Sequence, residues 1–188
     1  VYEKALYLSK KSNNGGKNVL IVEGGPGTGK SVVAINLLVE ATKREQVVQY
    51  ITKNSAPRAV YQSKLTGTMK KTEISNLFTG SGSFVNAKRN IFDTLIVDEA
   101  HRLNEKSGMF KNKGENQIKE IINAAKFSVF FIDEDQKVTF DDIGRKEEIE
   151  KFAEQLGANV HYAELITQFR CNGSDGYLAW LDNILQIR

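Results

Sequence analysis

The segment from Gly24 to Ser31, GGPGTGKS, constrains the fold of this chain more than any other. It fits the phosphate-binding pattern G-x4-G-K-[ST], whose glycines let successive backbone N–H groups point inward at phosphate oxygens. A short apolar run at 18–23 precedes it, and a long apolar segment that starts at Ser31 follows it. This order predicts a buried parallel strand, then a phosphate-binding loop, then a helix whose N-terminus adds partial positive charge.

The same segment predicts which groups contact a bound nucleotide. Lys30 is expected to reach the β- and γ-phosphates of ATP, and Ser31 is expected to ligate the accompanying Mg²⁺. The other contacts are expected from the backbone of the loop. The nucleotide-binding positions are Gly25, Pro26, Gly27, Thr28, Gly29, Lys30 and Ser31.

Strand and helix patterns alternate along the whole chain. Buried strands are expected where apolar residues run together, at 18–23, 47–52, 94–98, 127–132 and 158–165. Helices are expected from 31, over 55–65, over 115–126, over 145–156 and over 175–187, and 66–92 is expected to be a long loop with room for a short helix. This alternation predicts an α/β fold with three layers, α-β-α, and a mainly parallel central sheet, as in P-loop NTPases. Ligands of such sheets bind at the carboxyl ends of the strands.

A second motif follows the expected strand at 94–98. Three apolar residues, Leu95, Ile96 and Val97, lead into the run Asp98-Glu99-Ala100-His101, so two carboxylates lie at a strand end. Asp98 is expected to hold Mg²⁺, and Glu99 is expected to orient and deprotonate the attacking water. Two roles remain open for His101, which either couples the ATP site to a neighbouring motif or packs beside it.

Composition excludes several classes of protein. A chain of 188 residues suits one domain, and its single cysteine excludes a disulfide framework and a cysteine-based zinc site. No stretch approaches the roughly 20 apolar residues that a membrane helix needs, which favours a cytoplasmic protein with no membrane partner. The net charge is only +3, but 53–90 carries seven bases and one acid. Such a patch suits nucleic-acid phosphates, although a solvated surface is the alternative.

Five motifs in order resemble the first RecA-like domain of a superfamily 1 helicase. The motif after the fourth expected strand, at 127–132, departs from the usual G-D-x-x-Q, because Ile132 stands in place of the glycine. A closer resemblance, in the runs DEAHRL, FFIDEDQ and QFRC, is to the Schlafen-related group of P-loop ATPases of the DNA/RNA helicase type. The five motifs are GGPGTGKS at 24–31, ITKNSA at 51–56, DEAH at 98–101, DEDQ at 133–136 and LITQFR at 165–170.

The resemblance implies two more catalytic residues and a second domain. Gln136 would contact the γ-phosphate or its attacking water, and Arg170 would donate to the γ-phosphate as charge develops. Members of the family carry a second RecA-like lobe that completes the ATP site. Residues 1–188 are therefore expected to be one RecA-like ATPase domain from a longer protein, and to hydrolyse ATP weakly when isolated.

The resemblance also places a nucleic-acid groove beside the ITKNSA motif at 51–56. Thr52, Asn54, Arg58 and Lys64 would lie along it and contact single-stranded DNA or RNA. All four lie in or next to the basic stretch at 53–90, which is the independent reason to expect a phosphate backbone there. The aromatic residues of the same stretch could stack on bases or pack beneath the loop.

Three functions are compatible with these residues. The first is ATP hydrolysis by the motor domain of a DNA/RNA helicase or translocase. The second is an ATP-dependent switch of the same fold that acts on a protein partner in defence or signalling. The third, a P-loop kinase, is disfavoured because a phosphotransferase has no need for Glu99 to activate water.

Overall fold

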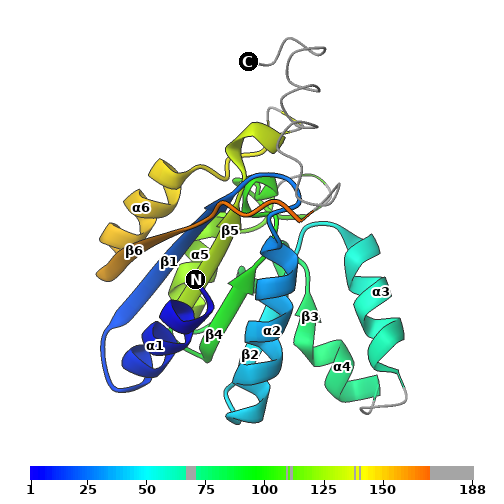
Figure 1. The fold of residues 1–188 in the computed structure, drawn as a ribbon. Coiled ribbons are helices and arrows are strands. Elements are labelled where there is room, and N and C mark those ends of the chain that lie inside the picture. Colours follow the sequence, from blue (N-terminus) through cyan, green and yellow to red (C-terminus); the bar gives the residue numbers. More distant parts are fainter. Residues whose placement is uncertain (67–70, 109, 111, 138, 140, 170–188) are drawn as a thin grey trace.

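The fold is an α/β sandwich around one six-stranded sheet, in the computed structural model shown in Figure 1. The structure describes residues 1–66, 71–108, 110, 112–137, 139 and 141–169. Every strand pair is parallel, and the strand order is β3-β2-β4-β5-β1-β6. The predicted three-layer fold with a mainly parallel sheet is confirmed. The strands are β1 (Lys17–Gly24), β2 (Val48–Ile51), β3 (Phe78–Thr79), β4 (Phe92–Val97), β5 (Ala125–Ile132) and β6 (Ala158–Leu165).

Helices cover both faces of the sheet. Apolar residues of α1, α2 and α4 pack on one face, together with Leu20 and Val22 of β1. Apolar residues of α5 and α6 pack on the other face, together with Val19 and Ile21 of the same strand. The α-helices are α1 (Tyr2–Asn13), α2 (Lys30–Lys43), α3 (Ser55–Leu65), α4 (Lys71–Leu77), α5 (Gln117–Ala124) and α6 (Lys146–Gln155), and the 3₁₀ helices are η1 (Ser81–Phe84), η2 (Ala100–Arg102) and η3 (Glu134–Gln136).

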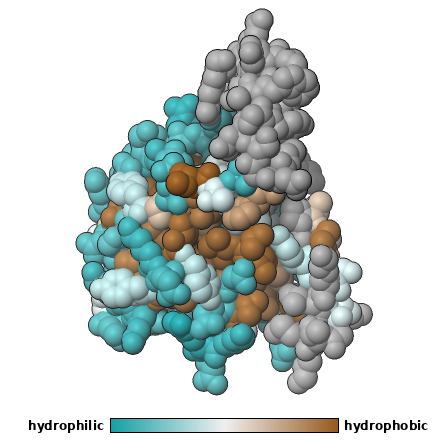
Figure 2. All heavy atoms as spheres, viewed as in Figure 1, coloured by the Kyte–Doolittle hydropathy of each residue, from teal (hydrophilic) through white to brown (hydrophobic). Residues whose placement is uncertain are grey.

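The packing explains why the middle of β1, from Val19 to Val22, is apolar on both faces. Successive side chains of a strand point to opposite faces, and both faces of this sheet are covered, so both sets of side chains must be apolar. The space-filling view shows that apolar residues also reach the surface on the side that carries α1 and α2 (Figure 2). Val32 and Val39 of α2 are 65% and 43% exposed.

Helix α5 passes into β5 without a loop, and side chains donate or accept hydrogen bonds at both of its ends. The Asn116 side chain accepts hydrogen bonds from the backbone of Ile118 and Lys119 at the start of the helix. At its end, the buried Lys17 ammonium donates to the carbonyls of Ile122 (2.6 Å) and Asn123 (3.2 Å) and to that of Ala125. These donors satisfy carbonyls that a helix end leaves unpaired.

The structure differs from the sequence predictions in three elements. Helix α1 was not predicted, yet Ala5 and Leu8 on one of its faces are buried while charged residues lie outside. The stretch at 66–92 is not mainly loop, because it contains α4, β3 and η1. The helix predicted over 115–126 is shorter, and β5 begins two residues early. The predicted helix over 175–187 lies outside the described residues. Among the helices of the described ranges, none has the length and hydropathy needed to traverse a bilayer.

Candidate nucleotide-binding site

The predicted site residues converge at the carboxyl ends of β1, β4, β5 and β6. A cavity of about 770 Å³ opens there, between the loop that follows β1 and the segment that follows β6. Lys30, Ser31, Glu99 and Gln136 line it, so the structure brings together four residues predicted from three separate motifs. The exposed ring of Phe169 borders the same cavity.

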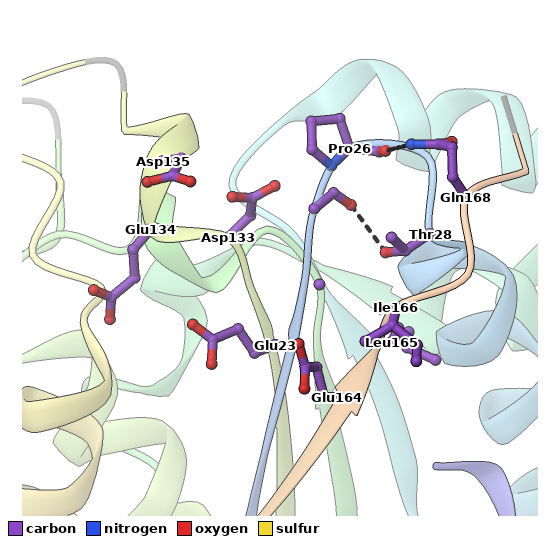
Figure 3. Close-up of a pocket in the computed structure, with 12 residues that line it drawn as sticks. Glu23, Pro26, Thr28, Asp133, Glu134, Asp135, Glu164, Leu165, Ile166 and Gln168 are labelled. Atoms are coloured by element: carbon purple, nitrogen blue, oxygen red, sulfur yellow. Dashed lines mark hydrogen bonds between the residues drawn. The ribbon is translucent and has the colours of Figure 1, made fainter. Parts of the chain in front are cut away.

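Glycines give the loop after β1 its shape. Gly27 and Gly29 have φ angles of +79° and +85°, in the left-handed region that glycine adopts readily, and α2 begins directly after Gly29. At Gly24, a Cβ atom would lie only 2.6 Å from Thr28 Oγ1. Thr28 closes the loop by donating its hydroxyl to the carbonyl of Gly25 at 2.9 Å (Figure 3).

The Lys30 ammonium lies within the loop. Its Nζ donates to the carbonyls of Gly24 and Gly25 at 2.5 Å and 2.9 Å, and it lies 3.4 Å from Asp133 Oδ2. The side chain is only 6% exposed. Helix α2 and this ammonium supply positive charge at the same point, as phosphate binding requires.

A cluster of oxygen atoms from Ser31, Tyr50 and Asp98 lies beside Lys30. Ser31 Oγ donates to Asp98 Oδ2 at 2.7 Å, and the hydroxyl of Tyr50 donates to the same oxygen at 2.5 Å. The backbone N–H of Glu99 donates to Asp98 Oδ1 at 3.0 Å. Burial raises the pKa of Asp98, and the hydrogen bonds from Tyr50 and Ser31 act against that rise. A carboxylate and a hydroxyl are the hard donors that Mg²⁺ prefers, so these residues fit this ion.

Tyr50 was not identified from the sequence. It lies inside an expected apolar strand, and its contact with Asp98 depends on the register of β2 against β4, where it pairs with Ile96. A single sequence does not specify that register, and no local motif marks the tyrosine.

Glu99 is positioned by the backbone and by His101. Glu99 itself has a φ of +56°, unusual for a residue with a side chain, and its carboxylate is 28% exposed. His101 Nε2 lies 3.1 Å from Glu99 Oε2, and His101 Nδ1 accepts from the backbone N–H of Asp133 at 3.3 Å. A neutral imidazole with its proton on Nε2 satisfies both contacts. The hydrogen bond from His101 is the main cause that lowers the pKa of Glu99.

His101 therefore has contacts on both sides, which favours the coupling role over simple packing. The residue is 1% exposed and joins the DEAH motif to the residue that follows β5. Gln136 belongs to the same network, since its Nε2 donates to Asp133 Oδ2 at 2.8 Å. Ile132, which departs from the family pattern, is fully buried in the core at the end of β5.

The segment after β6 packs on the phosphate-binding loop. Gln168 Nε2 donates to the carbonyl of Pro26 (Figure 3), and the Phe169 N–H donates to the carbonyl of Gly27 at 3.0 Å. The ring of Phe169 lies 3.6 Å from the position that a Cβ atom would take on Gly29. Arg170, predicted to contact the γ-phosphate, lies outside the described residues.

A second cavity, of about 370 Å³, borders the same loop and the segment after β6, and carboxylates line it (Figure 3). One of its carboxylates, Glu23, is 3.0 Å from the ammonium of Lys146. Negative charge there repels phosphate, so the triphosphate is expected in the cavity that Lys30 lines. The carboxylates of the acidic cavity belong to Glu23, Asp133, Glu134, Asp135 and Glu164.

The predicted nucleic-acid residues do not form one exposed row. Thr52 is 1% exposed, so its side chain does not face solvent. Asn54 is exposed at the start of α3, and Arg58, one turn on, donates from Nε to the carbonyl of Asn54 at 3.4 Å. Lys64 lies in the last turn of α3, and its side chain is outside the described set.

Other members of the basic stretch have structural partners. Lys53 Nζ lies 2.9 Å from Asp142 Oδ1, a carboxylate that Arg102, from outside the stretch, also contacts at 3.0 Å. Phe78 and Phe84, which could have stacked on bases, are 4% and 3% exposed and pack in the core. The exposed part of the predicted groove therefore centres on Asn54 and Arg58.

Several solved structures resemble this fold, with low sequence identity. The helicase domain of Pyrococcus furiosus Hef aligns over 86% of this chain and 37% of its own, with 14% identity and a TM-score of 0.46. A DNA replication initiation factor aligns over 98% and 50%, with 18% identity and a TM-score of 0.44. AMPPCP-bound DnaA from Aquifex aeolicus aligns over 96% and 53%, with 16% identity and a TM-score of 0.43. Similarity at this level says nothing about function.

Family membership is settled by sequence. No curated protein matches this chain. A family model does match, over residues 17–188, which include the phosphate-binding loop, the DEAH motif and the segment after β6. The chain thus belongs to the family described as Schlafen group 3, DNA/RNA helicase domain.

Proposed function

We propose that this chain binds ATP with Mg²⁺ and hydrolyses ATP as the motor domain of a DNA/RNA helicase or translocase. The observation that carries the proposal is the position of the Glu99 carboxylate. It lines the cavity that also contains Lys30 and Ser31, and His101 holds it through a hydrogen bond of 3.1 Å. Membership of a DNA/RNA helicase domain family supports the same function.

In the proposed reaction, Lys30 binds the β- and γ-phosphates, and Ser31 and Asp98 hold Mg²⁺. The bound ion would neutralise charge on the phosphate oxygens. Water attacks the γ-phosphorus, its proton passes to Glu99, and the bond from this phosphorus to the bridging oxygen breaks to leave ADP.

Two further residues act on the γ-phosphate in this proposal. Gln136 orients the water or contacts the γ-phosphate, since its amide both donates and accepts. Arg170 would donate to the oxygens on which charge develops.

The catalytic role of Glu99 is tested by Glu99→Gln. Glutamine keeps the shape of the side chain but cannot accept the proton, so turnover should fall about 10²- to 10⁴-fold while ATP affinity is kept. Lys30→Ala serves as the comparison, because it should weaken binding itself. ADP release and ATP affinity are measured for both variants, and unchanged turnover in Glu99→Gln would remove this residue from the proposed role.

Binding of single-stranded DNA or RNA is the second part of the proposal, with Thr52, Asn54, Arg58 and Lys64 along the groove. Since Thr52 is buried, Arg58 is the residue to test. Each phosphate contact should contribute about 0.7 to the slope of log K against log salt, and Arg58→Glu should lower affinity and slope. Lys43→Glu, the same charge reversal at the far end of α2, is the control. A flat salt dependence in the parent favours the switch that acts on a protein partner.

A second RecA-like lobe in the full-length protein is the third part of the proposal. In that arrangement the cavity beside Lys30 faces the other lobe, which adds charge and excludes water when it closes. Residues 1–188 alone should then bind ATP but turn it over slowly. Steady-state ATPase assays with and without single strands compare this piece with the full-length protein. Strong stimulated turnover by residues 1–188 alone would contradict the two-lobed arrangement.

A further inference from the structure

The hydroxyl of Tyr50 contacts the carboxylate that is proposed to hold Mg²⁺. It donates to Asp98 Oδ2 at 2.5 Å, and Ser31 Oγ donates to the same oxygen at 2.7 Å. Three donors thus fix this carboxylate, since the Glu99 N–H occupies Oδ1 at 3.0 Å. The proposed function gives Ser31 a direct contact with Mg²⁺, but it gives none to the Tyr50 hydroxyl or to the Glu99 N–H.

The tyrosine is held rigidly from β2. It is fully buried, and it pairs with Phe78 of β3 and with Ile96 of β4 in the sheet register. Its ring meets that of Tyr61 at 5.8 Å in an edge-to-face arrangement and that of Phe78 at 5.6 Å. Rings packed at such distances have little freedom, so the direction of the hydroxyl is fixed.

Packing alone does not account for the hydroxyl. The surroundings of the ring are apolar, and a phenylalanine would fill them equally well. A buried hydroxyl needs a partner. The Tyr61 side chain also interacts with this hydroxyl, but its shortest contact is with one particular carboxylate oxygen, Asp98 Oδ2, at the end of the neighbouring strand. Groups that orient a metal ligand from behind commonly affect metal affinity by about 10- to 100-fold.

We propose that Tyr50 is a positioning residue for the magnesium site, whose hydroxyl holds Asp98 so that its carboxylate and Ser31 Oγ face the same cation. The inference rests on the proposed function, because it assumes that Ser31 and Asp98 bind Mg²⁺. Ser31 can then turn its hydroxyl toward the metal, while Tyr50 still anchors Asp98 Oδ2.

The test measures how Mg²⁺ changes nucleotide affinity, without relying on turnover. A fluorescent ATP analogue is titrated into the purified protein in EDTA and at a series of Mg²⁺ concentrations. Tyr50→Phe should need about 10- to 100-fold more Mg²⁺ for the same gain in affinity, with the affinity in EDTA unchanged. Tyr162→Phe is the matched control, since it removes an exposed tyrosine–carboxylate hydrogen bond of 2.9 Å, to Glu150, away from the site.

A second variant separates positioning from packing. Phe78→Leu loosens the same ring cluster but keeps the hydroxyl, so it should lower the melting temperature and raise the Mg²⁺ requirement much less than Tyr50→Phe does. If Tyr50→Phe has the Mg²⁺ requirement of the parent, or if Phe78→Leu raises it as much, the positioning role is wrong. If the parent shows no Mg²⁺-dependent affinity, or Lys30→Ala binds as well as the parent, the proposed function itself fails.

Discussion

Substitution of Gly144 by alanine should damage the ATP site from a distance. A Cβ atom at this position would lie 2.7 Å from both the Ala100 carbonyl carbon and the His101 Cα, and closer still to the Ala100 oxygen. Carbon atoms in contact are about 3.5–4.0 Å apart, so the two backbone segments must separate by roughly 1 Å. We expect such a shift to lengthen the hydrogen bond of His101 to Glu99, now 3.1 Å.

The expected magnitudes follow from this displacement. Overpacking of this kind costs about 1–3 kcal/mol, and each kcal/mol lowers the melting temperature of a domain of this size by about 2–4 °C. A misplacement of about 1 Å at a catalytic group can lower turnover by about 10²-fold, whereas ATP affinity should persist because Lys30 is not displaced.

Thermal melting, ATP affinity and ADP release are the assays for Gly144→Ala. Gly80→Ala is the control, since its Cβ would meet no atom closer than 3.5 Å and its backbone φ is an ordinary −88°. A Gly144→Ala protein with the melting temperature and turnover of the parent would refute the reasoning.

Two further predictions concern pH. His101→Ala removes the main cause that lowers the pKa of Glu99, so the acid limb of the rate profile should move to higher pH, and an unmoved limb would contradict the role of His101. Burial lowers the pKa of Lys17 to about 8 from 10.5, so between these values the unfolded chain binds more protons and stability should rise with pH. Lys17→Met lacks this titrating group, so its unfolding free energy should change less with pH. Between pH 8 and 10.5 the parent should gain at most about 3 kcal/mol relative to this variant. If the unfolding free energies of the two proteins change in parallel with pH, the prediction is wrong.

The long apolar strands could be predicted from the sequence, because their burial on both faces requires a continuous apolar run. Helix α1 was missed because Glu3 and Lys4 interrupt its apolar positions, and only the packed structure shows that Ala5 and Leu8 form a buried face. Strand β3 has two residues, too few for any period, and it is held by the packing of Phe78 on β2.

For the site, the predicted residues that the structure brings together are those marked by local motifs, and their roles remain predictions. Lys30 and Ser31 are neighbours in one motif, and Asp98 and Glu99 are neighbours in another, and the structure places both pairs at one cavity or beside it. The hydrogen bond between Tyr50 and Asp98 joins two strands, so it depends on register and has no local signal.

The remaining failures have the same origin. The Asp133 carboxylate contacts Lys30 and Gln136, and the Asp133 backbone N–H donates to His101. These contacts meet at one residue only because β5 lies between β1 and β4 in the sheet. Thr52 was expected to face a groove, but it lies at the end of β2, where its N–H donates to the carbonyl of Thr79 and its side chain is enclosed. Neither enclosure nor strand order can be read from motif spacing.

The order of the strands has a consequence for how the protein folds. β1 carries the phosphate-binding loop and is made early in synthesis, yet it pairs only with β5 and β6. Asn18 meets Phe127 and Asn159, partners 109 and 141 positions further along the chain. Contacts between such distant residues form slowly, because a long loop must first close at a cost in chain entropy. During synthesis on the ribosome, β1 must therefore wait without its partners, and the loop that follows it gains its native support only after β5 and β6 have been made.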